Sequence, residues 1–258
     1  MQIPARLNPT FTKPGPAEND PLEEARRRLI VALDVPTAKA ALDLVNRLER
    51  TCCWFKVGLE LFTSAGPAAL EPILARGHSV FLDLKFNDIP NTVAGAVRSA
   101  AALGVQMMTL HASGGPAMLS AAQKALDGLE KPPQLLAVTV LTSMDQAQVE
   151  AVGLDRTPAQ QVALLARMGQ DAGVSGFVCS PQEVATLRAL AGPEAVLVIP
   201  GIRPSGATVG DQKRIATPAD ALRRGASYLV VGRPITQAAD PADAAEAIQK
   251  EMAEALAE

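Results

Sequence analysis

Three charged side chains of alternating sign lie close together in the sequence at Asp83, Lys85 and Asp88. The apolar run before them, at residues 78–82, predicts a buried strand, and Pro90 after them predicts the first turn of a helix. Because side chains two apart point to the same side of a strand, Asp83 and Lys85 should share one side at its carboxyl end. Two carboxylates and an ammonium group are therefore expected to converge at the mouth of a strand.

A lysine held between carboxylates suits the delivery of a proton. It stays protonated and fixed in place, as a general acid must be if it is to protonate a developing carbanion. Asp34 and Lys56, each near the end of another apolar run, extend the group to five charges with Asp83, Lys85 and Asp88. An ion-pair network that only stabilises the rim is the alternative. Buried ion pairs often lose as much in desolvation as they gain in attraction, so we favour catalysis.

A second group of residues suits the binding of a phosphate dianion. The Gly232-Arg233-Pro234 sequence combines a backbone that a ligand can approach closely, a guanidinium group and a short helical turn. A long loop at residues 201–215 contains Gln212, Lys213 and Arg214 and predicts a lid or a binding loop. The alternative is that these basic residues only cover the surface, and we favour it for Lys213 and Arg214.

From Leu29 onward, short apolar runs alternate with longer helical patterns, which predicts repeated βα units. The expected strands are residues 29–34, 54–58, 79–84, 107–111, 135–141, 176–179, 196–200 and 228–232. The expected helices are residues 37–50, 67–75, 91–102, 116–129, 158–171, 181–191, 218–224 and 241–257. Eight such units without an internal linker predict an α/β fold, a single (β/α)₈ TIM barrel with its active site at the C-terminal ends of the strands.

This barrel would gather most of the unusual polar residues at one end. Thr142 and Ser143 follow the fifth expected strand, and His111 ends the fourth. A catalytic base is one interpretation of His111. The tight turn that follows it favours the other, a packed histidine bonded to backbone.

Composition excludes several classes of protein. The 258 residues carry a net charge of −3 and no basic stripe with interleaved aromatic side chains, which argues against nucleic-acid binding. No apolar run is long enough to span a membrane and the N-terminus lacks the apolar core of a signal peptide, so we expect a cytoplasmic location.

Cys52, Cys53 and Cys179 have no metal-ligand spacing and predict free thiols. Residues 1–28 predict an extended, proline-rich arm, and residues 29–258 predict the barrel domain.

Taken together, the motifs resemble those of the orotidine 5′-phosphate decarboxylase family. The resemblance extends from about residue 29 to residue 235, and the sequence DLKFNDIPNT at residues 83–92 carries most of it. Further matches follow in the family's order: LD at 33–34, FKVG at 55–58, HASGG at 111–115, LTS at 141–143, PGIRP at 200–204, DQKR at 211–214 and VGRPIT at 231–236.

The resemblance implies a homodimer that converts orotidine 5′-monophosphate to uridine 5′-monophosphate and carbon dioxide, the last step of pyrimidine nucleotide synthesis, with no metal or organic cofactor. It implies that Lys85 protonates C6 of the pyrimidine and that Asp83 crowds the departing carboxylate. The other implied contacts are Asp34 and Lys56 at the ribose, Thr142 and Ser143 at the pyrimidine, Gln212 between base and phosphate, Arg203, Gly232 and Arg233 at the phosphate, and Asp88, Ile89 and Thr92 in the neighbouring subunit's site.

Two rival functions remain open on the sequence. Related barrel enzymes use a similar Asp-x-Lys-x-x-Asp pattern with Mg²⁺ on sugar phosphates and act through an enediolate. The sequence FNDIPNT at residues 86–92 and the Gln212 loop speak against that function. A barrel that only binds nucleotides is the other rival, and the complete set of five charges makes it the weaker one.

Overall fold

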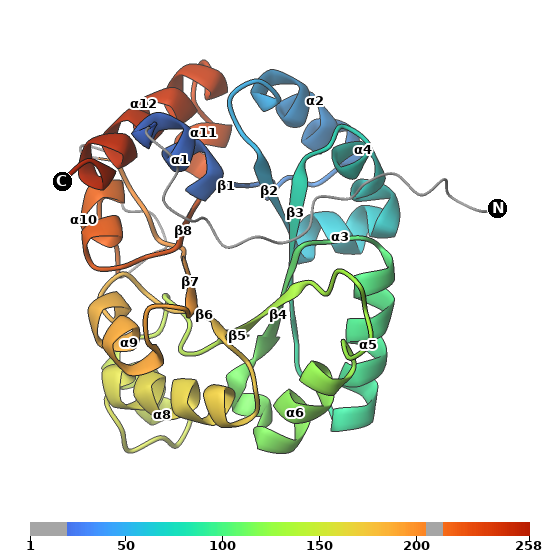
Figure 1. Ribbon diagram of the computed structural model, residues 1–258, viewed down its shortest axis with the longest axis vertical. Coiled ribbons are helices and arrows are strands. Elements are labelled where there is room, and N and C mark those ends of the chain that lie inside the picture. The colour runs from blue at the N-terminus through green and yellow to red at the C-terminus, as the bar shows by residue number, and fades with distance from the viewer. Residues whose placement is uncertain (1–19, 205–213) are drawn as a thin grey trace.

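The computed structural model describes residues 20–204 and 214–258, and within them eight parallel strands close into a barrel (Figure 1). The strands are β1 (Leu29–Ala32), β2 (Trp54–Gly58), β3 (Ser79–Phe86), β4 (Met107–His111), β5 (Gln134–Val138), β6 (Gly176–Val178), β7 (Val196–Ile199) and β8 (Tyr228–Val231). Each strand pairs with the next along the chain, and β8 pairs with β1. The predicted fold class, a single (β/α)₈ barrel, is confirmed.

Helices surround the barrel on its outside (Figure 1). The α-helices are α1 (Pro21–Arg28), α2 (Ala38–Leu48), α3 (Leu59–Ala65), α4 (Glu71–Leu74), α5 (Pro90–Ala102), α6 (Pro116–Lys124), α7 (Gln146–Ala151), α8 (Pro158–Asp171), α9 (Val184–Ala191), α10 (Pro218–Arg223), α11 (Arg233–Thr236) and α12 (Pro241–Leu256), and the 3-10 helices are η1 (Gly66–Ala69) and η2 (Ala112–Gly114). None of the helices in the described part of the chain has the length and apolar character needed to cross a membrane.

The structure differs from prediction between β2 and β3. The single helix predicted at residues 67–75 is instead two short segments, η1 and α4, and the unpredicted helix α3 precedes them. Pro67 and Pro72 each lie in the first turn of a new segment, because proline has no N–H to continue the preceding one. The six-residue α7 is also unpredicted, since so short a helix shows little periodicity.

The extended arm was predicted at residues 1–28; residues 1–19 lie outside the described residues, and for residues 21–28 the prediction is wrong. Residues 21–28 form the helix α1, whose N-cap Asp20 accepts a hydrogen bond of 2.9 Å from the Leu22 amide. This helix lies beside α12 (Figure 1) and buries Ala25 completely. Prolines favoured an extended arm, but Pro21 lies in the first turn of α1, where proline is compatible with a helix. Arg28 also forms an ion pair with Glu24 one turn earlier.

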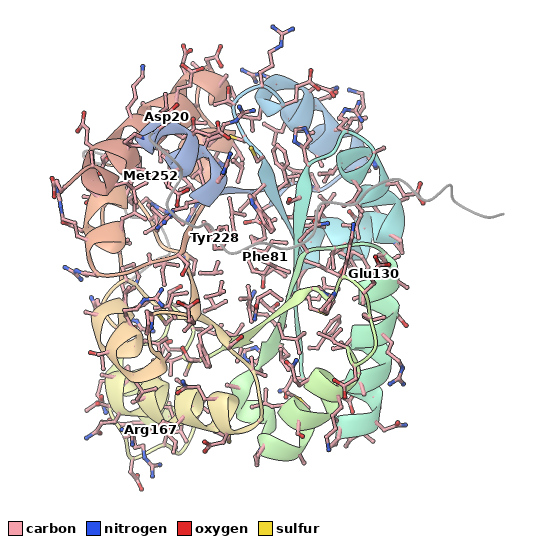
Figure 2. All side chains as sticks on the ribbon, in the orientation of Figure 1. Asp20, Phe81, Glu130, Arg167, Tyr228 and Met252 are labelled. Atoms are coloured by element: carbon pink, nitrogen blue, oxygen red, sulfur yellow. The ribbon has the colours of Figure 1, made fainter. Side chains whose placement is uncertain are left out.

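Alternate residues of the strands fill the barrel interior. Ile30 and Ala32 of β1 point inward, whereas Val31 between them packs outward against the helices. Figure 2 shows Phe81 and Tyr228 inside the ring of strands. Because this apolar filling supports the strands from within, the residues just beyond their carboxyl ends are held at fixed positions around one opening.

Candidate active site

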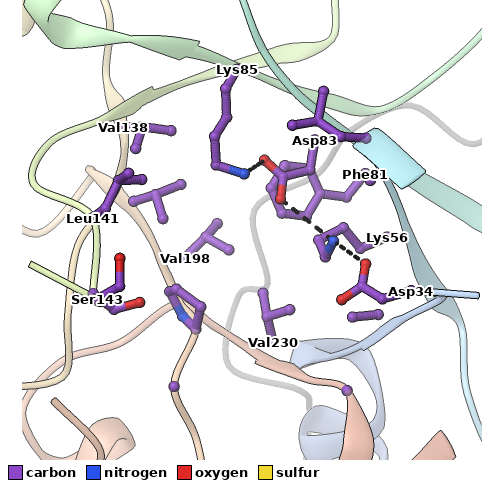
Figure 3. Close-up of a pocket in the computed structure, with 18 of the residues that line it drawn as sticks. Asp34, Lys56, Phe81, Asp83, Lys85, Val138, Leu141, Ser143, Val198 and Val230 are labelled. Carbon is purple, nitrogen blue, oxygen red and sulfur yellow. Dashed lines mark hydrogen bonds and ion pairs between the residues drawn. The ribbon is translucent and has the colours of Figure 1, made fainter. Parts of the chain in front are cut away.

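A cavity of about 630 Å³ opens at the carboxyl ends of the strands. This volume is typical of pockets for small ligands. Apolar side chains, among them Phe81, Val198 and Val230, form part of its wall (Figure 3). The predicted site residues that line it are Asp34, Lys56, Asp83, Lys85, Thr142, Ser143, Arg203, Gly232 and Arg233. The barrel therefore brings together side chains that lie far apart in the sequence.

Four of these residues form a continuous chain of alternating charge (Figure 3). The ammonium nitrogen of Lys56 lies 2.9 Å from Oδ1 of Asp34 and 3.5 Å from Oδ2 of Asp83. The ammonium nitrogen of Lys85 lies 2.8 Å from Oδ1 of Asp83. Asp83 is thus shared by two lysines, and its carboxylate fixes both at one side of the cavity.

Burial makes this network electrostatically strong. The side chains of Lys56 and Asp83 are only 10% and 13% exposed. Burial alone would raise the pKa of Asp83, but the charges of Lys56 and Lys85 hold that pKa below its ordinary value. Burial likewise opposes the charge of Lys56, yet Asp83 and Asp34 raise its pKa above the ordinary value. Both groups are therefore ionised at neutral pH.

The backbone of β3 is distorted where it presents these charges. Leu82 pairs with Met108 of β4, but Phe86 pairs with Leu110, so β3 contains two more residues than β4 over this stretch. Within it, Lys85 adopts a φ of 51°, and it is the one non-glycine residue with positive φ in the described part of the chain. Asp83 and Lys85 line the cavity together as predicted, but regular strand alternation is not the reason.

Two arginines meet at another part of the cavity. Arg203 follows β7, and Arg233 follows β8 directly after Gly232. Burial lowers the pKa of Arg203, and the nearby positive charge of Arg233 lowers it further. Two neighbouring guanidinium groups that line one cavity suit the binding of an anion.

Thr142 and Ser143 line the cavity from the loop after β5, and a buried ion pair fastens this loop. Arg214 donates a hydrogen bond of 2.9 Å to the carbonyl oxygen of Leu141, directly before Thr142. Its guanidinium group also pairs with Glu183, which accepts a second hydrogen bond from the hydroxyl of Ser180. The surface role predicted for Arg214 is therefore wrong, because the side chain lies inside the protein. Lys213 and Gln212 lie outside the described residues.

Three predicted site residues do not line this chain's own cavity. Asp88, Ile89 and Thr92 are exposed at the start of α5. The carboxylate of Asp88 accepts a hydrogen bond of 2.6 Å from the amide of Ile89, and 67% of Ile89 is accessible to solvent.

Some residues of the cavity were not predicted from the sequence. Glu60 of α3 lines it, as do Thr236 and Gln237 at the end of α11. All three follow the end of a strand within a few residues, so the rule that located the other site residues also applies to them.

His111 does not line the cavity. Burial, with a contribution from Lys85, lowers its pKa, and the imidazole is therefore neutral at pH 7.

The same geometry indicates which groups could hold a cation. Within residues 20–204 and 214–258, no three His, Cys, Asp or Glu side chains gather as a metal site requires. Asp34 and Asp83 both line the cavity, but the ammonium group of Lys56 lies between their carboxylates. The prediction of free thiols is confirmed, since Cys52, Cys53 and Cys179 form no disulfide.

The sequence of this chain is similar to those of known proteins. The profile of the orotidine 5′-phosphate decarboxylase / HUMPS family matches residues 27–248. The chain belongs to this family. The family match begins in the last turn of α1 and includes all eight strands, so every described part of the cavity falls within it.

Individual members of the family are similar over nearly their whole length. Orotidine 5′-phosphate decarboxylase from Nitrosococcus oceani is 53% identical over 227 residues, which cover 88% of this chain and 98% of that protein. The enzyme of the same name from Moorella thermoacetica is 53% identical over 234 residues, with 88% and 93% covered. The crystal structure of orotidine 5′-phosphate decarboxylase from Lactobacillus acidophilus has a TM-score of 0.78 and 39% identity, with 88% and 99% covered.

Proposed function

We propose that this chain decarboxylates orotidine 5′-monophosphate to uridine 5′-monophosphate, with Lys85 as the proton donor to C6. The observation that carries the proposal is the Asp34–Lys56–Asp83–Lys85 chain of charges, which faces the same cavity as two arginines. An anionic nucleotide could place its phosphate at the arginines and its reacting ring near Lys85. The family relationship identifies the substrate, and the reaction would complete pyrimidine nucleotide synthesis.

The proposed chemistry follows from where charge develops. When the bond between C6 and the carboxylate carbon breaks, CO₂ departs and the electron pair stays on C6 in the plane of the ring. That pair cannot delocalise into the ring, so a fixed positive charge nearby stabilises it. The ammonium group of Lys85 supplies this charge and then its proton, which forms the new C6–H bond. Asp83 would repel the substrate carboxylate, but we attach more weight to the preorganised lysine.

The remaining residues would bind the nonreacting parts of the nucleotide. We assign the ribose to Asp34 and Lys56, and the pyrimidine to Thr142 and Ser143. The phosphate falls to Arg203, Gly232 and Arg233, with Gln212 bridging it to the base. Binding energy gained at the phosphate, far from the bond that breaks, can raise turnover as well as affinity.

We further propose that the enzyme is a homodimer with shared active sites. Asp88, Ile89 and Thr92 would complete the neighbouring subunit's cavity. All three are exposed, and none of them lines the cavity of its own chain. A cytoplasmic location also remains a prediction.

A magnesium-dependent reaction on a sugar phosphate is the second candidate, because related barrel enzymes that catalyse it use a similar Asp-x-Lys-x-x-Asp pattern. A specific observation disfavours it. Lys56 lies between Asp34 and Asp83, where its ammonium group competes with any divalent cation for the same carboxylates.

The deciding experiment follows the near-ultraviolet absorbance of orotidine 5′-monophosphate and the release of CO₂, with and without excess EDTA. We expect equal activity in both conditions. Activity that needs added Mg²⁺ would favour the sugar-phosphate enzymes, and a flat trace at high protein concentration would favour a barrel that only binds nucleotides.

A further inference from the structure

Thr109, in the middle of β4, links the two central charges of the site through one hydroxyl group. Its Oγ1 accepts a hydrogen bond of 2.9 Å from the backbone amide of Lys85 and donates one of 3.0 Å to Oδ1 of Asp83. The direction of both bonds is fixed, because an amide can only donate and an ionised carboxylate can only accept. Thr109 is also completely buried.

The distortion of β3 explains why such a hydroxyl is needed. Thr109 lies between Met108 and Leu110, the two residues whose partners on β3 are four apart. The backbone hydrogen-bond ladder between β3 and β4 is therefore irregular at Lys85. The side-chain hydroxyl of Thr109 accepts the hydrogen bond of the Lys85 amide instead. A buried amide without a partner, at a residue whose positive φ already carries strain, would destabilise this conformation.

We propose that Thr109 is a positioning residue for decarboxylation, which holds the carboxylate of Asp83 and the backbone of Lys85 in fixed relation. The inference rests on the proposed function. Packing alone does not account for the residue, because valine would fill the same space while leaving the Lys85 amide and one acceptor site of Asp83 without this partner. The hydroxyl sets where the Lys85 side chain departs from the strand, and so where its ammonium group meets the substrate.

Two charged groups face Asp83 and favour its ionisation, Lys56 from β2 and Lys85 from β3. His111 lies farther along β4 and is neutral at pH 7. Asp34 acts on it through Lys56. The hydrogen bond from Thr109 adds to the effect of the two lysines and helps to lower the pKa of Asp83.

The test compares Thr109→Val, which removes the hydroxyl and keeps the shape, with Thr109→Ser, which keeps the hydroxyl. We expect Thr109→Val to lower kcat about ten- to a hundredfold, the effect expected for a lost hydrogen bond to a charged group. Binding of uridine 5′-monophosphate should change much less, and Thr109→Ser should retain most of kcat. The acid limb of the pH profile of kcat should move to higher pH in Thr109→Val, because Asp83 loses a bond that favours its charged form.

A matched control is Thr139→Val. The hydroxyl of Thr139 is also buried and donates a hydrogen bond of 2.9 Å, but to the carbonyl oxygen of Val178 rather than to a charged group. This variant should lose stability and keep both kcat and the pH profile. If Thr109→Val does not fold, Thr109→Ala and Thr109→Ser supply a second pair that differs only in the hydroxyl.

Each outcome separates the positioning role from the proposed function. An active wild type with unchanged kcat and pH profile in Thr109→Val would overturn the role of Thr109 alone. Equal losses in Thr109→Ser and Thr109→Val would also overturn it, since the hydroxyl would then be irrelevant. A wild type that does not decarboxylate orotidine 5′-monophosphate would instead reject the proposed function.

Discussion

The ammonium nitrogen of Lys85 lies 2.8 Å from Oδ1 of Asp83, and both residues lie in the irregular stretch of β3 between Leu82 and Phe86. This contact restrains a flexible lysine, whose side chain is 28% exposed, at the wall of the cavity. A proton donor held in this way loses little further entropy when the substrate binds.

Lys85→Ala should abolish turnover while leaving nucleotide binding measurable. The substitution removes both the fixed charge and the proton, so we expect kcat to fall at least about a thousandfold. Calorimetric titration with uridine 5′-monophosphate measures the remaining affinity. Lys39→Ala is the control, because Lys39 forms a comparable ion pair with Asp43 on the surface. Substantial turnover in Lys85→Ala would refute Lys85 as the donor.

The stability of the protein should depend on pH through Asp83. A group whose pKa is lowered by folding stabilises the native state above its unfolded value, here 3.8, and this contribution disappears as the pH falls through the lower folded value. Asp83→Asn lacks the contribution at every pH. The difference in free energy of unfolding between wild type and Asp83→Asn, measured with urea, should therefore be constant near neutrality and shrink below about pH 4. A difference that stays constant into acid would contradict the lowered pKa.

The sequence could predict most of the barrel but only part of the site. The strand positions followed from apolar runs bounded by turn residues, and the location of Asp34, Asp83 and Arg233 followed from the rule that function gathers at the carboxyl ends. The positive φ of Lys85 and the hydroxyl bridge from Thr109 were not predictable, because they depend on a register shift between two strands. The burial of Arg214 depends in the same way on tertiary contacts with Glu183.

Glu183→Gln should destabilise the whole protein. The side chains of Arg214 and Glu183 are 7% and 6% exposed, so the substitution leaves a buried guanidinium without its counter-ion. Breaking a pair of this kind typically costs about 3–5 kcal/mol in free energy of unfolding. The exposed pair of Arg223 and Glu258 is the control, and Glu258→Gln should leave the thermal midpoint nearly unchanged. Equal losses of stability from the two substitutions would show that the buried pair stabilises the protein no more than the exposed pair does.

Mixing two inactive variants should restore activity if the active sites are shared. Asp34→Ala damages a chain's own cavity, whereas Asp88→Ala would damage the cavity of its neighbour. A heterodimer of the two therefore contains one intact site, and free exchange at equal concentrations should recover about a quarter of the wild-type activity. Mixing Asp34→Ala with Asp83→Ala is the matched control, because both residues line the same chain's cavity and no intact site can form. Subunit exchange is checked by native mass spectrometry, and exchange without recovered activity would show that Asp88 serves no neighbouring site.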